Sequence, residues 1–537
     1  MLVYLEVTKM SYKILVSDQL NEHGLSKFTE EYQVDYKPGL PHEELKEIIG
    51  DYEALLIRSS TQVTEDVLKN AKNLKVVGRA GVGTDNIAVD AATREGILVI
   101  NAPGGNTIAA AEHAIAMMFA IARKIPQANM KMKDEKWEKK PFMGVELYQK
   151  KLGILGLGRI GSEVAKRARG LEMDVIAYDP YISERKASKL QIDILGVEEV
   201  LKQADFVSLH LPKTDETMNL INESTLEIMK DGAFIVNCAR GGLIDENALY
   251  DALKDGKIAG AALDVFDKEP LQDYRLVELD NVVATPHLGA STKEAQALVA
   301  EDIVEQVIRA LKGEPVNTAV NVPSVPEDIA TDVKPYIPLA RNMGSFFAQV
   351  FGGKIQEIQM EYYGDITSYP LKPLTNTFLK GIFSEIVKDQ INYVNAPVIA
   401  EERGVNIIEK KSSKKKDYQN LIQARIKTDE GERVIAGTLF GKHDPRFVRI
   451  GEFKVDVVPT KHLLVIDYID TPGMIAAVSK ILGERSINIA GMQVGRQSVG
   501  GDAMMIMQVD SSIDKETLED IKDIPQMTDA KACFLKD

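Results

Sequence analysis

Residues 151–170 read KLGILGLGRIGSEVAKRARG, in which a glycine-rich turn joins an apolar strand to a helical stretch. Gly156, Gly158 and Gly161 form the pattern G-x-G-x-x-G in that turn. Such glycines permit a tight turn, let the backbone approach a pyrophosphate, and bring the helix close to the strand. The pattern on its own also suits a structural turn, but in this context it predicts a dinucleotide-binding βαβ unit.

The next strand supplies a second feature of such a site. Residues 174–179 read DVIAYD and end in Asp179, where a carboxylate accepts hydrogen bonds from an adenosine ribose. An acidic residue repels a 2'-phosphate, and no basic residue follows immediately, so NAD is expected rather than NADP. Arg159 and Ile160 lie inside the turn and are natural phosphate and backbone contacts, although their side chains equally suit packing.

On both sides of this unit, between residues 12 and 320, short apolar strands alternate with helical stretches. Strands that are apolar throughout belong to parallel sheets with helices on both faces. Ten strands exceed one comfortable sheet, so we expect an α/β protein with two doubly wound lobes that divide near residue 100. Helices over 106–124 and 293–313 could cross between the lobes, with Gly313 as a helix stop. The ten expected strands are 12–17, 53–57, 74–78, 96–101, 151–157, 174–179, 204–210, 232–237, 260–265 and 281–285.

The pattern changes after residue 321. Residues 335–457 mix helix with alternating strand patterns; DEGE at 429–432 predicts a hairpin turn, and KKSSKKK at 410–416 is interpreted as a solvated loop tip. Residues 462–537 follow a βαββα order. We therefore expect two α+β domains after the two lobes. The expected domains are 1–100 completed by 293–320 (substrate lobe), 101–292 (NAD lobe, Rossmann type), 321–457 (intervening domain) and 458–537 (regulatory domain).

Composition excludes several classes of function. The 537 residues carry a net charge of -15, which argues against nucleic acid or an anionic membrane as the main partner. No apolar run is long enough to span a bilayer, and the first ten residues lack a secretory pattern. The two cysteines are too few for a disulfide framework or a zinc cluster, so a cytoplasmic protein without metal is expected. Residues 1–9 are given no role.

Polar residues follow three later strands of the second lobe. Arg240 follows the strand at 232–237, Asp264 and Glu269 lie at and after the end of the strand at 260–265, and His287 follows the strand at 281–285. Each has an ordinary structural explanation when taken singly. Because ligands bind beyond the carboxyl ends of parallel strands, these groups are expected to converge beside the nicotinamide.

Oxidation of a 2-hydroxy acid needs this set of residues. Hydride leaves C2 while a base removes the hydroxyl proton, and a guanidinium grips the carboxylate with two hydrogen bonds. His287 is the expected base, Glu269 would orient its ring and raise its pKa, and Arg240 would bind and polarise the acid.

The segments GILGLGRIG, NCARGG, ALDVFDKEP and PHLGAST, in this order, resemble the D-isomer-specific 2-hydroxyacid dehydrogenase family. VVGRAGVGTDNI, NAPGGNT and MKDEKWEKKPFMGVEL extend the resemblance over residues 12–320. It implies Arg240, Glu269 and His287 as the catalytic set. Val82 and Leu211 stand where some relatives have threonine, so only their main chain is expected to bind. With the three glycines, the implied NAD contacts are Val82, Arg159, Ile160, Asp179, Leu211, Cys238, Ala239, Arg240, Asp264, His287, Leu288, Gly289 and Ala290.

A phosphate cradle is expected in the first lobe. Arg58, Ser59 and Ser60 follow the strand at 53–57, and Asn106 begins a helix whose amino end favours an anion. The resemblance implies substrate contacts at Arg58 and Asn106, and at backbone amides around Gly81. A surface ion pair is the alternative for Arg58, and Lys139 and Lys140 are weaker candidates. The implied reaction converts 3-phospho-D-glycerate to 3-phosphooxypyruvate, which opens the phosphorylated pathway to L-serine.

The C-terminal part carries two further resemblances. Residues 468–496 resemble the ACT module, which implies L-serine as an effector held by Asp470 and Asn488 around the turn at Pro472; DTPG alone would also make a plain turn. Residues 322–457 resemble the intervening domain of long members of the family. An anion site there is a hypothesis that competes with a solvated hairpin; its residues would be Lys442, His443, Arg446 and Arg449.

Two other functions compete with this prediction. Another D-2-hydroxyacid dehydrogenase, of the glyoxylate or D-lactate type, would have no use for Arg58, Asn106 and a serine sensor. A dinucleotide-sensing regulatory protein would not need Arg240, Glu269 and His287. Relatives also imply a homodimer or homotetramer.

Overall fold

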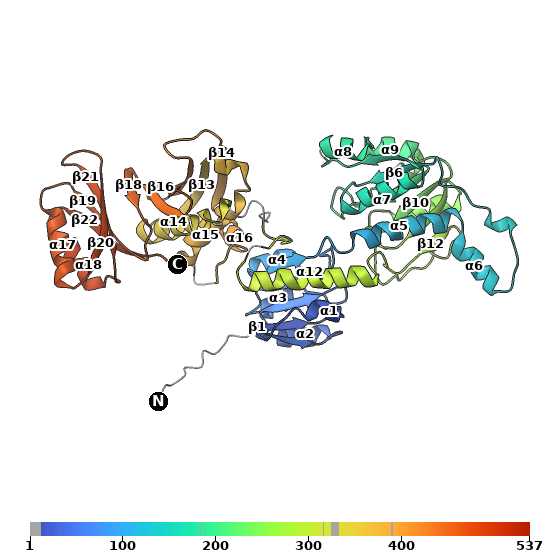
Figure 1. The fold of residues 1–537 in the computed structure, drawn as a ribbon, viewed down its shortest axis with the longest axis horizontal. Helices are drawn as coiled ribbons and strands as arrows, with labels where there is room; N and C mark the ends of the chain where they lie inside the picture. Colours follow the sequence, from blue (N-terminus) through green and yellow to red (C-terminus); the bar gives the residue numbers. More distant parts are fainter. Residues whose placement is uncertain (1–11, 183, 315, 324–331, 388–389, 537) are drawn as a thin grey trace, which may run out of the picture. The chain divides into compact units, whose positions relative to one another are not determined.

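The computed structural model describes residues 12–182, 184–314, 316–323, 332–387 and 390–536. Its contacts divide the chain into two compact units (Figure 1). One unit consists of Leu20–Ser26 and Ala102–Asp302, and the other contains the remaining residues. Residues 1–9 lie outside the described part.

The N-terminal lobe is built on a five-stranded parallel sheet in the order β2-β1-β3-β4-β5, the flavodoxin-like order. The central strands are buried on both faces, because β-branched and leucine residues fill them. The strand bounds are β1 (Tyr12–Val16), β2 (Tyr32–Tyr36), β3 (Ala54–Ile57), β4 (Val76–Arg79) and β5 (Leu98–Asn101), and the helices are α1 (Glu22–Leu25), α2 (His42–Ile48), α3 (Glu65–Asn70) and α4 (Val89–Arg94).

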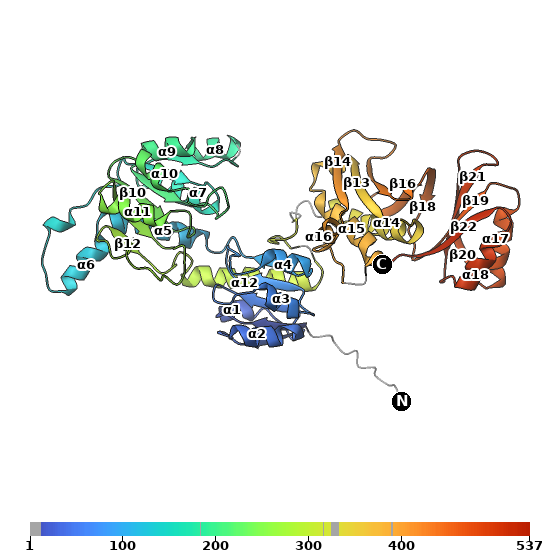
Figure 2. The ribbon, with the colours of Figure 1, turned by 180° about the vertical axis from the view of Figure 1, so that it is seen from behind.

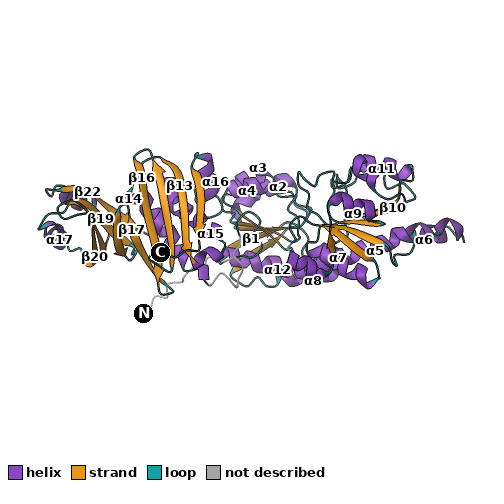
Figure 3. Cartoon of the chain, turned by 90° about the horizontal axis from the view of Figure 1, so that it is seen from above, coloured by secondary structure: helices purple, strands orange, loops and turns teal. Residues whose placement is uncertain are grey.

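The NAD lobe has a seven-stranded parallel sheet in the order β12-β11-β10-β9-β6-β7-β8, so the strand order reverses between β6 and β9. Helices α9 and α11 cover one face and α5 and α7 the other, each over its own apolar cluster (Figure 3). The strands are β6 (Lys151–Leu155), β7 (Asp174–Tyr178), β8 (Asp193–Ile194), β9 (Phe206–Leu209), β10 (Ala233–Asn237), β11 (Ile258–Leu263) and β12 (Val282–Ala284). The helices are α5 (Thr107–Ala122), α6 (Ile125–Lys133), α7 (Arg159–Gly170), α8 (Glu184–Leu190), α9 (Val197–Gln203), α10 (Glu223–Ile228) and α11 (Glu246–Lys254).

Helix α12 (Lys293–Leu311) follows the last strand of this lobe. It ends as expected, because Gly313 has a φ of 71° and its N–H bonds to Ala310 O at 3.0 Å.

The intervening part contains a six-stranded sheet in the order β14-β13-β15-β16-β17-β18. The expected hairpin at DEGE is confirmed, since β15 and β16 pair antiparallel around Asp429 and Glu430. The loop interpretation of 410–416 is partly wrong: Lys410–Ser412 belong to β14, which pairs parallel with β13, although Lys410 and Lys411 are exposed. The elements are α14 (Tyr336–Val350), β13 (Ile355–Gly364), α15 (Lys372–Ile386), α16 (Ala396–Glu402), β14 (Asn406–Ser412), β15 (Asn420–Thr428), β16 (Gly431–Phe440), β17 (Asp444–Ile450) and β18 (Phe453–Val457).

The C-terminal domain is a four-stranded antiparallel sheet in the order β20-β21-β19-β22 with α17 and α18 over one face (Figure 2). Its order along the chain is βαββαβ, so the expected pattern missed the last strand. The edge strand β22 is tied to α14, because the Gln349 side chain bonds the N–H and the carbonyl of Phe534, both at 2.8 Å. The elements are β19 (His462–Ile469), α17 (Met474–Glu484), β20 (Ile489–Arg496), β21 (Asp502–Val509), α18 (Lys515–Lys522) and β22 (Met527–Phe534).

The predicted fold class is confirmed: two doubly wound parallel-sheet lobes precede two α+β domains. The prediction of ten strands in the two lobes omitted β2 and β8. No helix in the described part of the chain is long and apolar enough to cross a membrane.

Candidate active site

His287 and Glu269 form a hydrogen-bonded pair beyond the carboxyl ends of β12 and β11. His287 Nδ1 lies 2.7 Å from Glu269 Oε2, and the other carboxylate oxygen of Glu269 accepts the N–H of Phe266 at 3.0 Å. The hydrogen bond to Glu269 raises the pKa of His287 against the effect of burial. Burial opposes ionisation of Glu269, yet the bonds from His287 and Phe266 hold its pKa below the ordinary value. Because Nδ1 faces a carboxylate, Nε2 carries the lone pair in the neutral ring.

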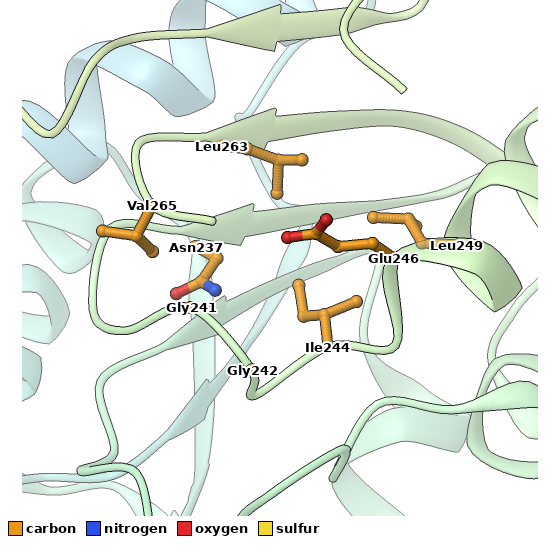
Figure 4. A pocket seen from close by; sticks show the side chains of 8 residues that line it. All are labelled: Asn237, Gly241, Gly242, Ile244, Glu246, Leu249, Leu263 and Val265. Atoms are coloured by element: carbon orange, nitrogen blue, oxygen red, sulfur yellow. The ribbon is translucent and has the colours of Figure 1, made fainter. Parts of the chain in front are cut away.

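Arg240 lies on a loop that Asn237 shapes. The Asn237 amide donates to Arg240 O at 2.9 Å and accepts the N–H of Ala239 at 3.1 Å. A small pocket lies against this loop (Figure 4). Its lining includes Glu246, whose carboxylate accepts the N–H of Asp267 at 2.7 Å and whose pKa burial raises. Asn237 thus fixes the Arg240 loop, and Glu246 fixes the turn before Glu269. The lining residues are Asn237, Gly241, Gly242, Ile244, Glu246, Leu249, Leu263 and Val265.

Asp264 is fully buried, and its carboxylate organises the loop of His287. Oδ1 accepts the Thr285 hydroxyl at 2.6 Å and the N–H of Leu288 at 2.7 Å, and Oδ2 accepts the N–H of Gly289 at 2.8 Å. His113 Nε2 also lies 3.2 Å from Oδ1. Burial opposes the charge, but these donors keep the pKa of Asp264 below its ordinary value. Asp264, predicted as a cofactor contact, therefore has protein groups as its partners.

The glycine turn has the shape that a dinucleotide requires. Gly156 has a φ of 99°, and a Cβ on Gly161 would lie 2.0 Å from Gly156 O. A Cβ on Gly158 would meet nothing within 4 Å, so the backbone there is open. Gly158 caps α7 without a side-chain bond, which leaves the first amides of the helix for an anion. These features fit the pyrophosphate of NAD.

Asp179 is held beside this turn. Its carboxylate accepts the N–H of Leu157 at 2.8 Å and the N–H of Tyr181 at 2.9 Å. His210, which sequence reasoning missed, lies under the turn, and burial lowers its pKa to about 4. Among the described residues its Nδ1 is buried without a partner, which suits a site that takes a polar ligand. The neighbouring Leu211 is half-buried.

The remaining predicted cofactor residues of this unit lie on the loops already described. Cys238 is buried at the end of β10, and burial raises the pKa of its thiol. Ala239 and Ala290 are half-buried, and Leu288 is exposed. Asn106 precedes α5, and its Oδ1 is buried without a partner among the described residues, a second place where a polar ligand would fit.

The other unit carries the predicted residues of the first lobe. The buried carboxylate of Asp18 accepts the N–H of Arg58 at 2.6 Å and the N–H and hydroxyl of Thr61 at 3.2 and 2.8 Å. Asn86 donates to the carbonyls of Arg58 and Thr61 at 2.8 and 2.7 Å. Asp18 and Asn86 therefore fix the backbone of the loop that carries the exposed Ser59 and Ser60. Gly81 and Val82 follow β4, and Val82 O accepts the Asn101 amide at 2.6 Å.

The predicted effector residues lie in the C-terminal domain. Gly473 has a φ of 95° and caps α17 without a side-chain bond. Asp470 pairs with Arg496 at 3.1 Å, and the Asn488 amide donates to Asp510 at 2.7 Å. In the intervening part, Arg446 pairs with Asp444 and Asp456, and Arg449 pairs with Glu452. Acidic neighbours thus balance two of the four basic residues considered for an anion site.

Three segments match family models. Residues 115–289 match the NAD-binding domain of D-isomer specific 2-hydroxyacid dehydrogenases, residues 332–451 the D-3-phosphoglycerate dehydrogenase intervening domain, and residues 462–526 the ACT domain. Among solved structures, the TT0316 protein of Thermus thermophilus is 35% identical with a TM-score of 0.54, covering 57% of this chain and 99% of that one. D-lactate dehydrogenase of Aquifex aeolicus, complexed with NAD and lactic acid, is 28% identical with a TM-score of 0.50, covering 56% and 96%.

Relatives match nearly the whole chain. The D-3-phosphoglycerate dehydrogenase of Synechocystis is 44% identical over 96% of this chain and 94% of its own length. That of Methanocaldococcus jannaschii is 43% identical over 96% and 98%, and that of Bacillus subtilis 42% over 97% and 99%. The NAD-binding fold, the His287–Glu269 pair and this similarity agree: the chain belongs to the D-3-phosphoglycerate dehydrogenases, within the D-isomer specific 2-hydroxyacid dehydrogenase family of NAD-dependent oxidoreductases.

Proposed function

We propose that this protein oxidises 3-phospho-D-glycerate to 3-phosphooxypyruvate with NAD, the first step of the phosphorylated route to L-serine. The observation that carries the proposal is the His287–Glu269 pair at 2.7 Å, on the lobe that has the NAD-binding turn. Relatives that match over nearly the full length and carry the name D-3-phosphoglycerate dehydrogenase support the substrate.

His287 acts as the base in this proposal. Neutral Nε2 takes the proton of the C2 hydroxyl, and Glu269 stabilises the imidazolium that forms. NAD supplies the hydride acceptor when it is bound. Arg240 holds the carboxylate of the substrate and polarises the oxygen at C2. In the reverse direction the imidazolium returns its proton to the keto oxygen.

The cofactor contacts in the proposal start at the glycine turn. Arg159 and Ile160 begin α7, whose free amides would bind the pyrophosphate, and Asp179 would bind the adenosine ribose. Val82, Leu211, Cys238 and Ala239 would contribute main-chain contacts. The loop His287–Ala290 would border the nicotinamide, and the buried Asp264 would support this loop.

The phosphate end of the substrate is assigned to Arg58, Ser59 and the Asn106 amide, and its carboxylate end to the amides around Gly81. Support comes from the fixed backbone of the 58–61 loop and from the position of Asn106 at the start of α5, where the amino end of the helix favours an anion. A glyoxylate reductase and D-lactate dehydrogenases share the fold of the two lobes, so fold alone does not select the substrate.

The test compares purified enzyme with NAD and either 3-phosphoglycerate, D-glycerate or D-lactate, with NADH absorbance as the readout. Wild type should prefer the phosphorylated acid in kcat/KM by on the order of 10³-fold or more, because unpaired site groups penalise a ligand without the phosphate. Arg58→Ala should remove most of this preference. Equal use of D-lactate would assign the protein to the rival dehydrogenase class, and absence of turnover with all three acids would favour the dinucleotide sensor.

We further propose that L-serine binds the C-terminal domain at Asp470 and Asn488 and inhibits the enzyme. The turn before α17 presents amides to a carboxylate, and Asp470 can accept an ammonium. Inhibition requires a coupling free energy of about 1–3 kcal/mol between the two sites. Calorimetry with L-serine should detect binding that Asn488→Ala weakens, whereas equal binding of D-serine would contradict the assignment.

We also propose that the protein forms a homo-oligomer in which residues 125–148 contact a second copy. No residue of α6 is buried, and this helix stands away from the sheet of its lobe (Figures 1 and 2). Trp137 is 76% exposed and Met143 80%. A single-chain surface seldom leaves so many large apolar side chains in water, and a second copy would cover them. The two free cysteines suit a cytoplasmic location.

A further inference from the structure

His113 on α5 makes a partly buried polar contact that the proposed mechanism does not use. Its Nε2 lies 3.2 Å from Asp264 Oδ1 and 3.2 Å from Thr285 Oγ1, and its side chain is 19% exposed. Thr285 Oγ1 in turn lies 2.6 Å from Asp264 Oδ1. The three side chains form a closed triangle inside the NAD lobe.

The hydrogen on this imidazole can be placed from its partners. Asp264 is ionised and only accepts, so the single hydrogen of the Thr285 hydroxyl is used on its carboxylate. Both atoms that face Nε2 are then acceptors. His113 must therefore carry a hydrogen on Nε2 and donate it. This hydrogen bond links helix α5 to the buried carboxylate of Asp264.

The carboxylate of Asp264 holds in place the loop that carries His287, the proposed base. Asp264 accepts the N–H groups of Leu288 and Gly289 through its carboxylate, and its own carbonyl accepts the N–H of His287 at 2.9 Å. His287 has a φ of 55°, a left-handed conformation that residues other than glycine seldom adopt. The bonds to Asp264 hold this conformation, so a shift of Asp264 would shift His287.

We propose that His113 is a positioning residue of the reaction: by donating Nε2–H to Asp264 and Thr285, it fixes the loop that presents His287 to the substrate. This inference rests on the proposed function, because it takes His287 as the base. It adds a role for helix α5, which links the start of the NAD lobe to the catalytic loop.

A pair of variants separates the hydrogen bond from packing. In His113→Gln the amide nitrogen can take the place of Nε2 and still donate, whereas His113→Leu fills similar space without a donor. We expect the leucine variant to lose about 10- to 100-fold in kcat, the usual consequence of a base displaced by about 1 Å. The glutamine variant should keep activity within about threefold of wild type.

A second readout does not depend on turnover. The chain has seven histidines, so NMR of protein labelled at histidine Cε1 can follow His287 through a pH titration, assigned with His287→Asn. In wild type the midpoint should lie above that of a free histidine, as the bond to Glu269 requires. It should stay there in His113→Gln and fall toward about 6.5 in His113→Leu, as the loop and its contact with Glu269 loosen.

His42→Gln is the matched control, because this histidine pairs with Asp66 at 3.3 Å on the first lobe. Its kcat and the His287 midpoint should equal those of wild type. Wild-type behaviour of His113→Leu in both readouts would overturn the proposal, as would an equal loss in both His113 variants. Absence of wild-type turnover with 3-phosphoglycerate would contradict the proposed function alone, and the titration would still decide the role of His113.

Discussion

Glu269 and His287 are joined by a hydrogen bond of 2.7 Å between Oε2 and Nδ1, and the second oxygen of Glu269 accepts the backbone N–H of Phe266. The carboxylate is therefore held on both sides and cannot turn away from the imidazole. This geometry directs Nε2 away from Glu269 as the acceptor of a proton. It makes the pair a base that is set before any ligand binds.

Replacing Glu269 by Gln should shift the pH dependence of oxidation to lower pH. The bond to Glu269 raises the pKa of His287, so in wild type the neutral base forms only as the pH rises through that elevated pKa. Glutamine carries no charge, and the midpoint of the acidic limb of kcat/KM should fall toward about 6.5. The plateau should drop by roughly tenfold or more, because the imidazolium is no longer stabilised. An unchanged acidic limb would separate Glu269 from the base.

Asp18→Ala should weaken substrate binding more than turnover. Asp18 fixes the backbone of the Arg58 loop through three bonds, and its loss leaves buried donors without an acceptor. We expect KM for 3-phosphoglycerate to rise about tenfold with KM for NAD unchanged, a loss near 1.4 kcal/mol. Initial rates with each substrate varied provide the measurement. Asp90→Ala on the exposed start of α4 is the control, and an equal rise in both KM values would contradict the assignment.

Asp179→Ala should change the choice of cofactor. The carboxylate beside the glycine turn would accept bonds from a ribose and repel a 2'-phosphate. Its removal should lower kcat/KM for NAD on the order of tenfold, the equivalent of one hydrogen bond to a charged group. Activity with NADP should rise at the same time. A fall with both cofactors would indicate that Asp179 only shapes the turn through the N–H of Leu157.

The fluorescence of Trp137 should show whether the protein forms a homo-oligomer. It is the only tryptophan and is 76% exposed in the single chain, so a buried, blue-shifted emission would mean that a second copy covers it. Trp137→Glu should reduce the mass found by light scattering, because a charge in an apolar interface stays unpaired. Red-shifted emission together with a monomeric mass in wild type would exclude an interface at this segment.

The sequence predicted much of this site because parallel strands place their carboxyl ends at one edge. Arg240, Glu269 and His287 follow three separate strands, and the latter two meet as expected. The residues that hold these side chains in place could not be predicted from the sequence. His113 and its partner Thr285 lie 172 positions apart, and a histidine on an apolar helix has no local signal for such a contact. Asp18 lies 40 positions from Arg58 and follows its strand without any motif.

Strand prediction failed where the physical signal was weak. Strand β8 has two residues, and β22 reads MTDAKACF, in which polar residues mask the alternation. Strand β14 is lysine-rich because it lies at the edge of its sheet, where charge is tolerated and discourages further pairing. The missed strands β8, β14 and β22 all lie at sheet edges, whereas the edge strands β5 and β12 were predicted because they are apolar.

We propose His287 as the base that takes the hydroxyl proton of a phosphorylated 2-hydroxy acid when NAD oxidises it. The decisive measurement is the rate of NADH formation from 3-phosphoglycerate in wild type and His287→Asn, across about pH 6 to about pH 10. Wild type should gain activity as the pH rises through the pKa of His287, and the variant should be slower by roughly 10² to 10⁴ without that rise. A variant that keeps the wild-type rate and the wild-type pH dependence would show that His287 is not the base.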